Sequence, residues 1–249
     1  MKISIITPTF NSERTVEDTI KSVLNQTYPD IEYIIIDGGS TDGTLDIIEK
    51  YKDKIAKIIS EQDRGIYDAM NKGIKLATGD IVGILNSDDF YASSDIIEMV
   101  ADEFREKNAD CVWGDLDYVD KDDLNRIVRR WQSSPYEEGK FQRGWHPPHP
   151  TFFIKKEIYK KYGFFRLDLS ISADYELMLR FLEKNKISSS YIPKVFVKMR
   201  VGGKSNKNVF NIIKANLQCL KAFRVNRLKV NPFLFFIKPM SKIFQFFKK

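Results

Sequence analysis

Three clusters of polar residues carry side chains suited to binding a charged ligand, and each follows an apolar run. They lie at residues 7–11, 37–42 and 86–89. In the third cluster, the carboxylates of Asp88 and Asp89 are hard oxygen ligands suited to Mg²⁺ or Mn²⁺, which keeps waters and shares the phosphates of a substrate. An Asp-Asp pair is also common as a solvated turn or a helix cap. Its position directly after a strand-like run favours the metal site.

The first two clusters carry groups that could hold a nucleoside. Asp37 can accept hydrogen bonds from a base N–H or a ribose hydroxyl, and the glycines that follow it allow the backbone to approach a ligand. An Asx turn is the alternative for Asp37. Thr7 and Thr9 could contact the same nucleoside, although Pro8 between them equally marks the end of a strand. Both interpretations stay open at this point.

The spacing of apolar residues predicts the elements that position these clusters. Strands are expected at residues 3–10, 31–36, 55–60 and 80–85, alternating with helices at 13–25, 44–51 and 66–77, the first of them capped by Ser12. This alternation is typical of a parallel sheet with helices on both faces. Ligands bind such sheets at the carboxyl ends of the strands, so we expect the three clusters to meet on one rim.

The second half of the chain has a different, α+β pattern. After a helix at 94–107, strands are expected at 111–119, 126–131 and 191–199, with helices at 155–161 and 173–183. Three prolines in residues 144–150 predict a rigid loop between these elements.

Composition restricts the class of protein. The chain has 249 residues, of which 43% are hydrophobic and 30% charged, which favours one compact domain over disorder. The two cysteines have no metal-ligand spacing and are expected to be reduced thiols. With neither a signal-peptide pattern nor an apolar run long enough to span a bilayer, we expect a cytoplasmic protein that touches the inner face of the cell membrane peripherally.

Four segments together resemble the family-2 glycosyltransferases with the GT-A fold. They are SIITPTFN at residues 4–11, DGGSTDGT at 37–44, NSDD at 86–89 and SEQDRGIYDAMNKG at 60–73, and the last is similar to the bacterial enzymes of polysaccharide, O-antigen and capsule synthesis. The resemblance implies an α/β fold with a Rossmann-like mixed sheet. We expect a catalytic domain at 1–222, with a nucleotide-sugar half at 1–110 and an acceptor half at 111–222, and an amphipathic tail at 223–249.

The resemblance also implies roles for residues of the first half. Thr7 and Asp37 match positions that hold the nucleoside, whereas Asp63 and Arg64 match the region lining the base and the diphosphate. Asp88 matches the last carboxylate of the family's Asp-x-Asp metal motif.

The first carboxylate of that motif is replaced here by Asn86. An amide oxygen can still bind a cation, and Asp89 can contribute directly or through water. We therefore expect Mg²⁺ or Mn²⁺ to bind, but more weakly than at a pair of carboxylates.

In the second half, the resemblance implies a general base at the start of a helix, and Asp174 fits that place. The alternative is that Asp174 or Ser172 is an ordinary helix cap. Trp145 and His149 are implied to bind the acceptor, because aromatic rings stack on the apolar faces of sugars. His146 and His149 could instead bind zinc, but no third ligand with suitable spacing follows.

The net charge of +6 is concentrated in about the last quarter of the chain. A helix from Pro239 would carry apolar residues on one face and lysines on the other, which suits a membrane interface. The alternative is a terminal helix packed on its own domain or on a partner.

Together these features predict an inverting transferase that moves a sugar from a nucleotide-sugar, with UDP favoured by the resemblance. The acceptor would be a lipid-linked or saccharide hydroxyl in cell-surface polysaccharide synthesis, and no nucleic-acid partner is expected. One alternative is a nucleotide-dependent oxidoreductase, but the first turn lacks Gly-x-Gly-x-x-Gly. The other, a non-catalytic membrane or nucleic-acid binding module, leaves the ordered acidic clusters unexplained.

Overall fold

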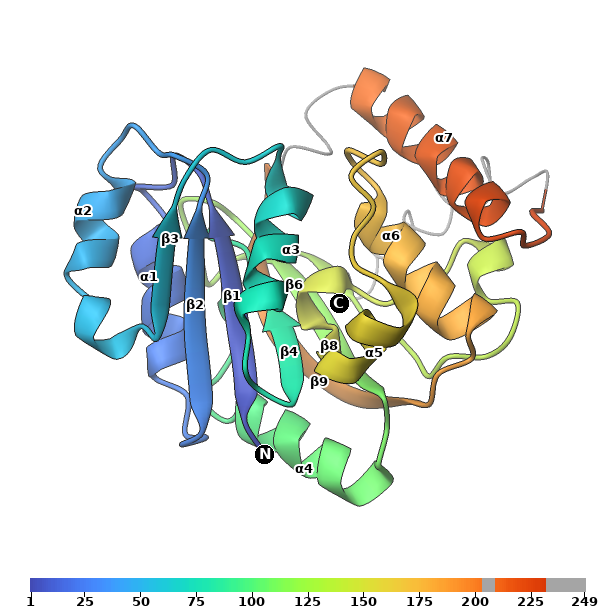
Figure 1. Cartoon of the computed structure of the whole chain (residues 1–249), viewed down its shortest axis with the longest axis horizontal. Helices are drawn as coiled ribbons and strands as arrows, with labels where there is room; N and C mark the ends of the chain where they lie inside the picture. Colours follow the sequence, from blue (N-terminus) through green and yellow to red (C-terminus); the bar gives the residue numbers. More distant parts are fainter. Residues whose placement is uncertain (203–208, 232–249) are drawn as a thin grey trace.

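The computed structural model describes residues 1–202 and 209–231, which fold around one mixed sheet of nine strands (Figure 1). Eight strands follow the order β3-β2-β1-β4-β8-β6-β9-β5, and β7 pairs with β6 at the side of this path. The first half alternates strands and helices as predicted. Its elements are β1 (Ile3–Thr9), α1 (Val16–Leu24), β2 (Ile31–Asp37), α2 (Thr44–Glu49), a 3₁₀ turn (Lys52–Lys54), β3 (Lys57–Ser60), α3 (Ile66–Leu76) and β4 (Ile81–Ile84).

The second half continues the same sheet with strands of both directions. The strand β6 pairs parallel with β9 and antiparallel with β7 and β8, whereas β5 returns antiparallel along β9. Its elements are β5 (Asp89–Tyr91), α4 (Ile96–Lys107), β6 (Cys111–Val119), β7 (Ile127–Trp131), 3₁₀ turns (Phe141–Arg143 and His149–Thr151), β8 (Phe153–Lys155), α5 (Lys156–Tyr162), α6 (Ala173–Met178), a π-helical turn (Leu179–Lys184), β9 (Ser189–Arg200) and α7 (Val209–Val225).

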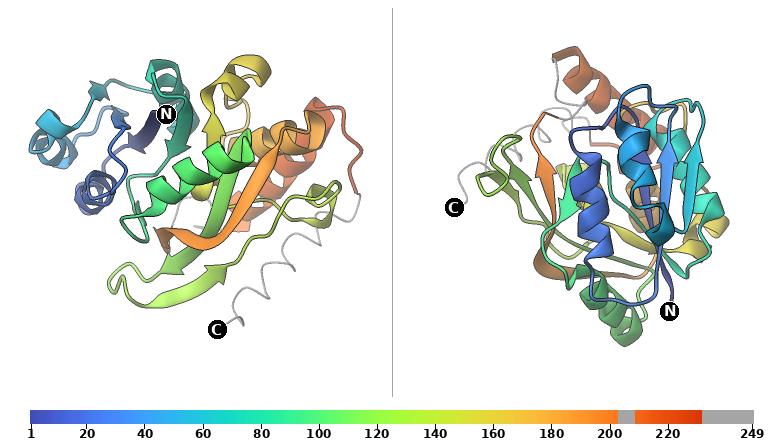
Figure 2. Two further views of the ribbon diagram at one scale, coloured as in Figure 1. Left: turned by 90° about the horizontal axis from the view of Figure 1, so that it is seen from below. Right: turned by 90° about the vertical axis from the view of Figure 1, so that its left-hand side faces the viewer.

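Two hydrophobic cores lie on the two faces of this sheet. Successive residues of β1 point into different cores: Ile5 packs with α1, α2 and α4, whereas Ile6 packs with α3, α5, α6 and α7. Both side chains are fully buried. The two helical layers can be followed in Figure 2, and they confirm the predicted α/β architecture. A strand that is buried on both faces has a nearly continuous apolar sequence, and this pattern allowed the strands to be predicted.

Several elements differ from the predicted ones. The helix α1 begins at Val16 rather than near residue 13, and Thr15 precedes it without a side-chain cap. The predicted cap by Ser12 is therefore wrong, because its hydroxyl donates to the carbonyl of Phe10 and pairs with Ser87. The short strands β5 and β8 and the helix α7 were not predicted.

The helix expected from Pro239 lies outside the described residues. The domain boundary predicted at residue 222 falls inside α7, and Leu228 and Val230 still pack against the core. Within residues 1–202 and 209–231, no helix combines the length and the apolarity needed to cross a bilayer.

Candidate active site

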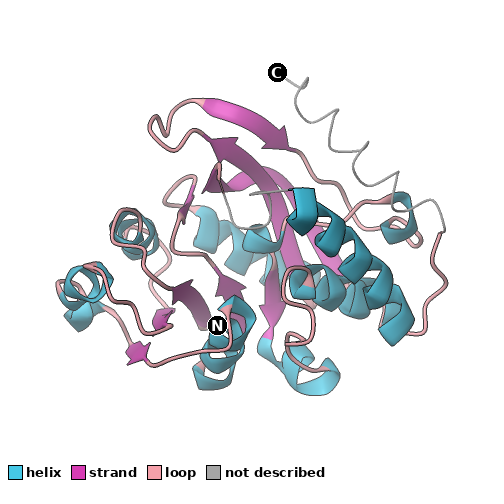
Figure 3. Ribbon diagram, turned by 90° about the horizontal axis from the view of Figure 1, so that it is seen from above, coloured by secondary structure: helices cyan, strands magenta, loops and turns pink. Residues whose placement is uncertain are grey.

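The three polar clusters meet at the carboxyl ends of β1, β2 and β4, as predicted. In Figure 1 these strands run upward from the N-terminus, and Figure 3 views the molecule from that upper side. Several hydrogen bonds join the loops, among them those of the pairs Gly38–Thr9 (2.9 Å), Asn11–Ser40 (2.8 Å) and Ser12–Ser87 (2.8 Å). The rim is therefore one connected surface.

Asp37 is fully buried at the end of β2 and shapes the loop that follows it. Its Oδ2 accepts hydrogen bonds from the backbone N–H groups of Gly39 and Ser40, both at 3.0 Å, and from the hydroxyl of Ser60 at 2.7 Å. Gly39 has a positive φ of 83°, which a side chain would strain. The Asx turn considered for Asp37 is thus present, and its nucleoside-binding role remains a prediction.

Asp63 lies against this turn. Its Oδ1 accepts a hydrogen bond of 2.8 Å from the N–H of Gly65, and a Cβ added to Gly38 would lie 2.7 Å from its Oδ2. Gly38 therefore leaves the space that the Asp63 carboxylate occupies. The next residue, Arg64, is exposed and forms an ion pair of 3.3 Å with Asp68.

Thr7 and Thr9 differ in what their hydroxyls contact. Thr7 is fully buried, and its Oγ1 is 3.1 Å from the hydroxyl of Tyr33, so its side chain faces the core. The Oγ1 of Thr9 is buried without a hydrogen-bond partner among the described residues. Of the two, Thr9 has the hydroxyl that a ligand at the rim could satisfy.

The predicted metal cluster contains two carboxylates in different surroundings. Asp88 is half-buried, and burial raises its pKa while the charge of Arg200 lowers it. Asp89 is fully buried, and desolvation together with the neighbouring Asp88 raises its pKa well above the usual range. The Oδ2 of Asp89 accepts a hydrogen bond of 3.0 Å from the Nδ2 of Asn86.

Two oxygens of this cluster are left without a protein partner. The Oδ1 of Asn86 and the Oδ1 of Asp89 are buried and accept no hydrogen bond from the described residues. Buried polar atoms of this kind are usually paired, so the amide and carboxylate oxygens fit a hard cation. Within the described ranges, no group of three or more His, Cys, Asp or Glu side chains could hold a metal by itself. A cation here would need further oxygens from water or substrate.

Arg200, at the end of β9, binds the loop that carries Asp88. Its guanidinium donates a hydrogen bond of 2.7 Å to the backbone carbonyl of Asp88, forms an ion pair with Asp18 and lies over the ring of Phe90 at 5.2 Å. It is only 7% exposed. The sequence analysis missed this role because Arg200 and Asp88 come together only through the pairing of β5 with β9.

Asp174, the predicted base, is the second residue of α6. Its Oδ1 accepts a hydrogen bond of 3.0 Å from the hydroxyl of Tyr67 in α3. The hydroxyl of Ser172 donates to the carbonyl of Ala215 in α7 at 3.1 Å, and no side-chain cap is present at this helix. Neither Ser172 nor Asp174 therefore caps α6 with its side chain.

Tyr118 of β6 links the two acidic regions. Burial raises the pKa of Tyr118, the charge of Arg129 lowers it, and the carboxylates of Asp89 and Asp174 raise it. The charges of both carboxylates therefore favour the neutral form of this phenol. This residue was missed in the sequence, which has no local signal for it.

Trp145 and His149 lie on the proline-rich segment between β7 and β8. Trp145 is half-buried in an aromatic cluster, with ring centroids 5.7 Å from Phe141 and 6.1 Å from Trp113. His149 is buried; burial lowers its pKa, and the charge of Asp174 opposes that change. The His149 ring lies 5.4 Å from the ring of Phe165, on which Tyr67, the partner of Asp174, also stacks. Acceptor binding by Trp145 and His149 remains a prediction.

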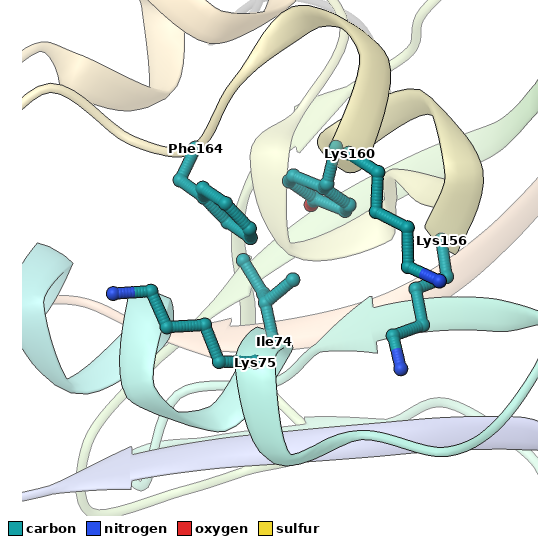
Figure 4. Close-up of a pocket in the computed structure, with 6 residues that line it drawn as sticks. Ile74, Lys75, Lys156, Lys160 and Phe164 are labelled. Carbon is teal, nitrogen blue, oxygen red and sulfur yellow. The ribbon is translucent and has the colours of Figure 1, made fainter.

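A separate shallow cavity of about 180 Å³ lies between the end of α3 and α5 (Figure 4). The cavity lies toward the C-terminal end of α3. None of its lining residues belongs to the three polar clusters, so it is not part of the rim. Its lining residues are Ile74, Lys75, Lys156, Tyr159, Lys160 and Phe164.

Comparison with known structures supports the fold. The chain is similar to S. aureus TarS 1–349 in complex with UDP-GlcNAc, with a TM-score of 0.69 and 20% identity over 91% of this chain and 65% of that one. It is also similar to a mannosyltransferase from Pyrobaculum calidifontis in complex with GDP-Man and Mn²⁺, with a TM-score of 0.67 and 19% identity over 96% of this chain and 67% of that one.

Comparison with protein sequences is more specific. The chain is 34% identical over 181 residues to an uncharacterized glycosyltransferase of Mycobacterium tuberculosis, which covers 72% of this chain and 68% of that protein. It is 30% identical over 210 residues to the PGL/p-HBAD biosynthesis glycosyltransferase of Mycobacterium bovis, covering 82% and 78%. The model of "Glycosyl transferase family 2" matches residues 4–163, which include all three polar clusters. With this match over more than half of its length, the chain belongs to glycosyl transferase family 2 and is a glycosyltransferase.

Proposed function

We propose that this glycosyltransferase transfers a sugar, with inversion, from a UDP-sugar to a hydroxyl of a lipid-linked or saccharide acceptor in cell-surface polysaccharide synthesis. The observation that carries the proposal is the meeting of the three polar clusters at the carboxyl ends of β1, β2 and β4, joined by hydrogen bonds between their loops. It supports a single site for a nucleotide-sugar at this rim. Other support comes from the UDP-GlcNAc in the TarS complex and the biosynthetic role in the name of the mycobacterial relative.

In this proposal each region of the rim has a separate task. Thr9, Asp37, Asp63 and Arg64 bind the nucleoside and the diphosphate, as donors and acceptors at the ends of β1, β2 and β3. The exposed Arg64 can turn from Asp68 toward a phosphate, because exposed ion pairs are weak. Trp145 and His149 orient the acceptor, which removes much of the entropic cost of the reaction.

The acidic cluster is proposed to hold Mg²⁺ or Mn²⁺ through Asp88, with Asn86 and Asp89 as supporting groups. When bound, the cation would stabilise the negative charge that develops on the departing diphosphate. Support comes from the oxygens of Asn86 and Asp89 that accept no hydrogen bond from the described residues, and from the Mn²⁺ in the complex of the mannosyltransferase. Arg200 supports the loop by binding the backbone carbonyl of Asp88.

Asp174 is proposed to take the proton of the acceptor hydroxyl. A carboxylate at the N-terminus of α6 is stabilised by the helix dipole, and Asp174 is half-buried rather than enclosed. Support comes from the contacts that connect Asp174 to His149, proposed to bind the acceptor: Tyr67 binds Asp174 and stacks on Phe165, whose ring meets that of His149.

A thermal-shift series with UDP-, GDP- and dTDP-sugars, each with and without Mn²⁺, tests the donor part of the proposal. We expect a UDP-sugar with Mn²⁺ to raise the unfolding temperature most, because a ligand that binds only the native state stabilises it. Stabilisation by none of the nucleotide-sugars would contradict the proposal.

Asp174→Asn tests the base, since an amide cannot accept the proton. We expect transfer to the acceptor to fall by about 100-fold or more, while UDP-sugar binding changes little. Transfer is measured with the donor that the thermal-shift series selects. Full transfer by this variant would show that Asp174 is not the base.

The membrane part of the proposal concerns α7 as well as the tail. The exposed side of α7 carries Phe210, which is 81% exposed, and Leu217, which is 55% exposed. Residues 209–231 contain no Asp or Glu and several Lys and Arg. Apolar and cationic groups on one helix suit the surface of an anionic bilayer. We therefore propose peripheral contact with the membrane that holds the lipid-linked acceptor.

A further inference from the structure

The helix α3 holds the segment that carries Asp174 by contacts far apart in the sequence. The side chain of Asn71 forms two hydrogen bonds of 2.9 Å with the backbone N–H and carbonyl of Phe165. The ring of Tyr67 stacks on the ring of Phe165, with centroids 5.5 Å apart and an interplanar angle of 22°. These contacts fix the Tyr67 ring relative to the chain that leads into α6.

The hydroxyl of Tyr67 lies between two acceptors. It is 2.8 Å from the carbonyl oxygen of Ile171 and 3.0 Å from Oδ1 of Asp174. A phenol has one proton and can donate to one acceptor at a time. A hydrogen bond to a charged carboxylate is stronger than one to a neutral carbonyl, so the proton favours Asp174 while that side chain is ionised.

Two other ionisable side chains, His149 and Tyr118, do not carry a positive charge that could replace the hydrogen bond from Tyr67 to Asp174. Burial lowers the pKa of His149, so its imidazole is neutral at pH 7. Burial also raises the pKa of Tyr118, whose ring carries the guanidinium of Arg129 at 3.7 Å. Among the described residues, the side-chain hydrogen bond to the carboxylate of Asp174 comes from Tyr67, at 3.0 Å.

We propose that Tyr67 is the positioning residue of the base: it orients the carboxylate of Asp174 before transfer and remains bound to Ile171 after Asp174 has taken up a proton. The inference rests on the proposed role of Asp174. No other residue needs to move, because both acceptors are already within reach of one hydroxyl.

In the transfer step, the acceptor oxygen forms a bond to the anomeric carbon of the donor sugar, and its proton passes to the carboxylate of Asp174. The bond between the anomeric carbon and the diphosphate oxygen breaks, and its electron pair leaves with the nucleoside diphosphate. As Asp174 becomes neutral, the proton of Tyr67 can turn to the carbonyl of Ile171.

Tyr67→Phe tests the inference, with Tyr51→Phe as the matched control. Tyr51 also donates to a carboxylate, that of Glu17 at 2.7 Å, but on the surface between α1 and α2. We expect Tyr67→Phe to lower kcat by about 10-fold or more with little change in the KM of the UDP-sugar. We also expect the acidic limb of its pH–rate profile to move to higher pH by about one unit, because a lost donor disfavours the ionised carboxylate. Tyr51→Phe should leave both unchanged.

The outcomes separate this inference from the proposal on which it rests. A wild-type kcat, or a lower kcat with an unmoved acidic limb, would overturn the role of Tyr67, provided that Asp174→Asn is inactive. An active Asp174→Asn would instead remove the base itself. Circular dichroism melting of each variant shows whether the fold is retained, and the shifted acidic limb is the readout that a purely structural role would not produce.

Discussion

At the scale of single residues, the acidic side chains of the rim differ in what satisfies them. Asp37 is buried, and its carboxylate accepts hydrogen bonds from Gly39, Ser40 and Ser60. These bonds stabilise the turn after β2. Asp89 is equally buried but has one oxygen without a donor, and desolvation raises its pKa. A carboxylate that is costly to bury without donors is a candidate for binding a cation.

The contact between Gly38 and Asp63 gives a prediction at this scale. In Gly38→Ala the new Cβ would lie 2.7 Å from Oδ2 of Asp63, so that carboxylate must turn away from the rim. The fold should be retained, because the end of a side chain moves more easily than backbone. We expect the KM for the UDP-sugar to rise by about tenfold if Asp63 binds it, as measured by initial rates.

Gly43→Ala is the control for this change. It lies in the same loop, but its Cβ would meet the Oε2 of Glu13 at 3.2 Å instead. It should leave the KM near that of the wild type. An unchanged KM in Gly38→Ala would count against a donor-binding role for Asp63.

At the scale of elements, a buried carboxylate joins β1, β2 and the turn before β4. Burial alone would raise the pKa of Glu32, but hydrogen bonds from Ser4 at 2.6 Å and from Thr78 at 2.6 and 2.8 Å, with the charge of Lys57 at 3.7 Å, lower it to about 2. The folded pKa lies below the ordinary value of 4.5, so ionised Glu32 stabilises the fold above about pH 4.5. That stability is lost as the pH falls toward 2.

Glu32→Gln should remove this stabilisation. The shift corresponds to about 3 kcal/mol, so we expect the free energy of unfolding at pH 7 to fall by about 2–3 kcal/mol. The difference from wild type should shrink at pH 3. Urea unfolding at both pH values measures it, and a difference independent of pH would contradict the electrostatic explanation.

Glu61→Gln is the matched surface change. Glu61 is 58% exposed and pairs with Lys72 at 2.8 Å. Exposed ion pairs contribute little, so the loss should stay below about 1 kcal/mol at either pH.

At the scale of the whole molecule, one sheet runs through both predicted halves. Because β4 pairs with β8 and β5 pairs with β9, the rim and the segment that carries Trp145 and His149 share the same two cores. The helix α7 closes the second core and is anchored beside the base: Gln218 accepts hydrogen bonds from the N–H groups of Ile171 at 2.9 Å and Ser172 at 3.1 Å. The helix that carries the exposed Phe210 and Leu217 is therefore attached directly to the segment before Asp174.

The membrane proposal gives a prediction for this surface. Replacing Phe210 and Leu217 by Asp in the full chain should weaken binding to vesicles containing anionic lipid by about tenfold or more, since apolar burial is lost and charge repulsion is added. Co-sedimentation measures the binding. Ile127→Asp, at a β7 position that is 38% exposed, is the control and should bind like wild type. Unchanged binding of the double variant would exclude α7 as the contact.

Much of the first half was predictable because local pattern and tertiary role agree there. The strands β1, β2 and β4 are buried on both faces, so they read as apolar runs, and parallel pairing brings the clusters after them to one rim. The segments β5, β8 and α7 were missed. Two of them are strands of three residues, too short for a periodic signal, and α7 keeps exposed apolar residues that blur its amphipathic pattern.

The family, the alternation of strands and helices, and the candidate acidic residues Asp37, Asp88 and Asp174 could all be read from the sequence, because they depend on residue type and on position along the chain. The groups that contact these residues could be found only from the folded structure. Tyr67 reaches Asp174 across 107 positions, and Arg200 reaches Asp88 across 112. Such contacts depend on strand order and on helix packing, and neither leaves a local mark in the sequence.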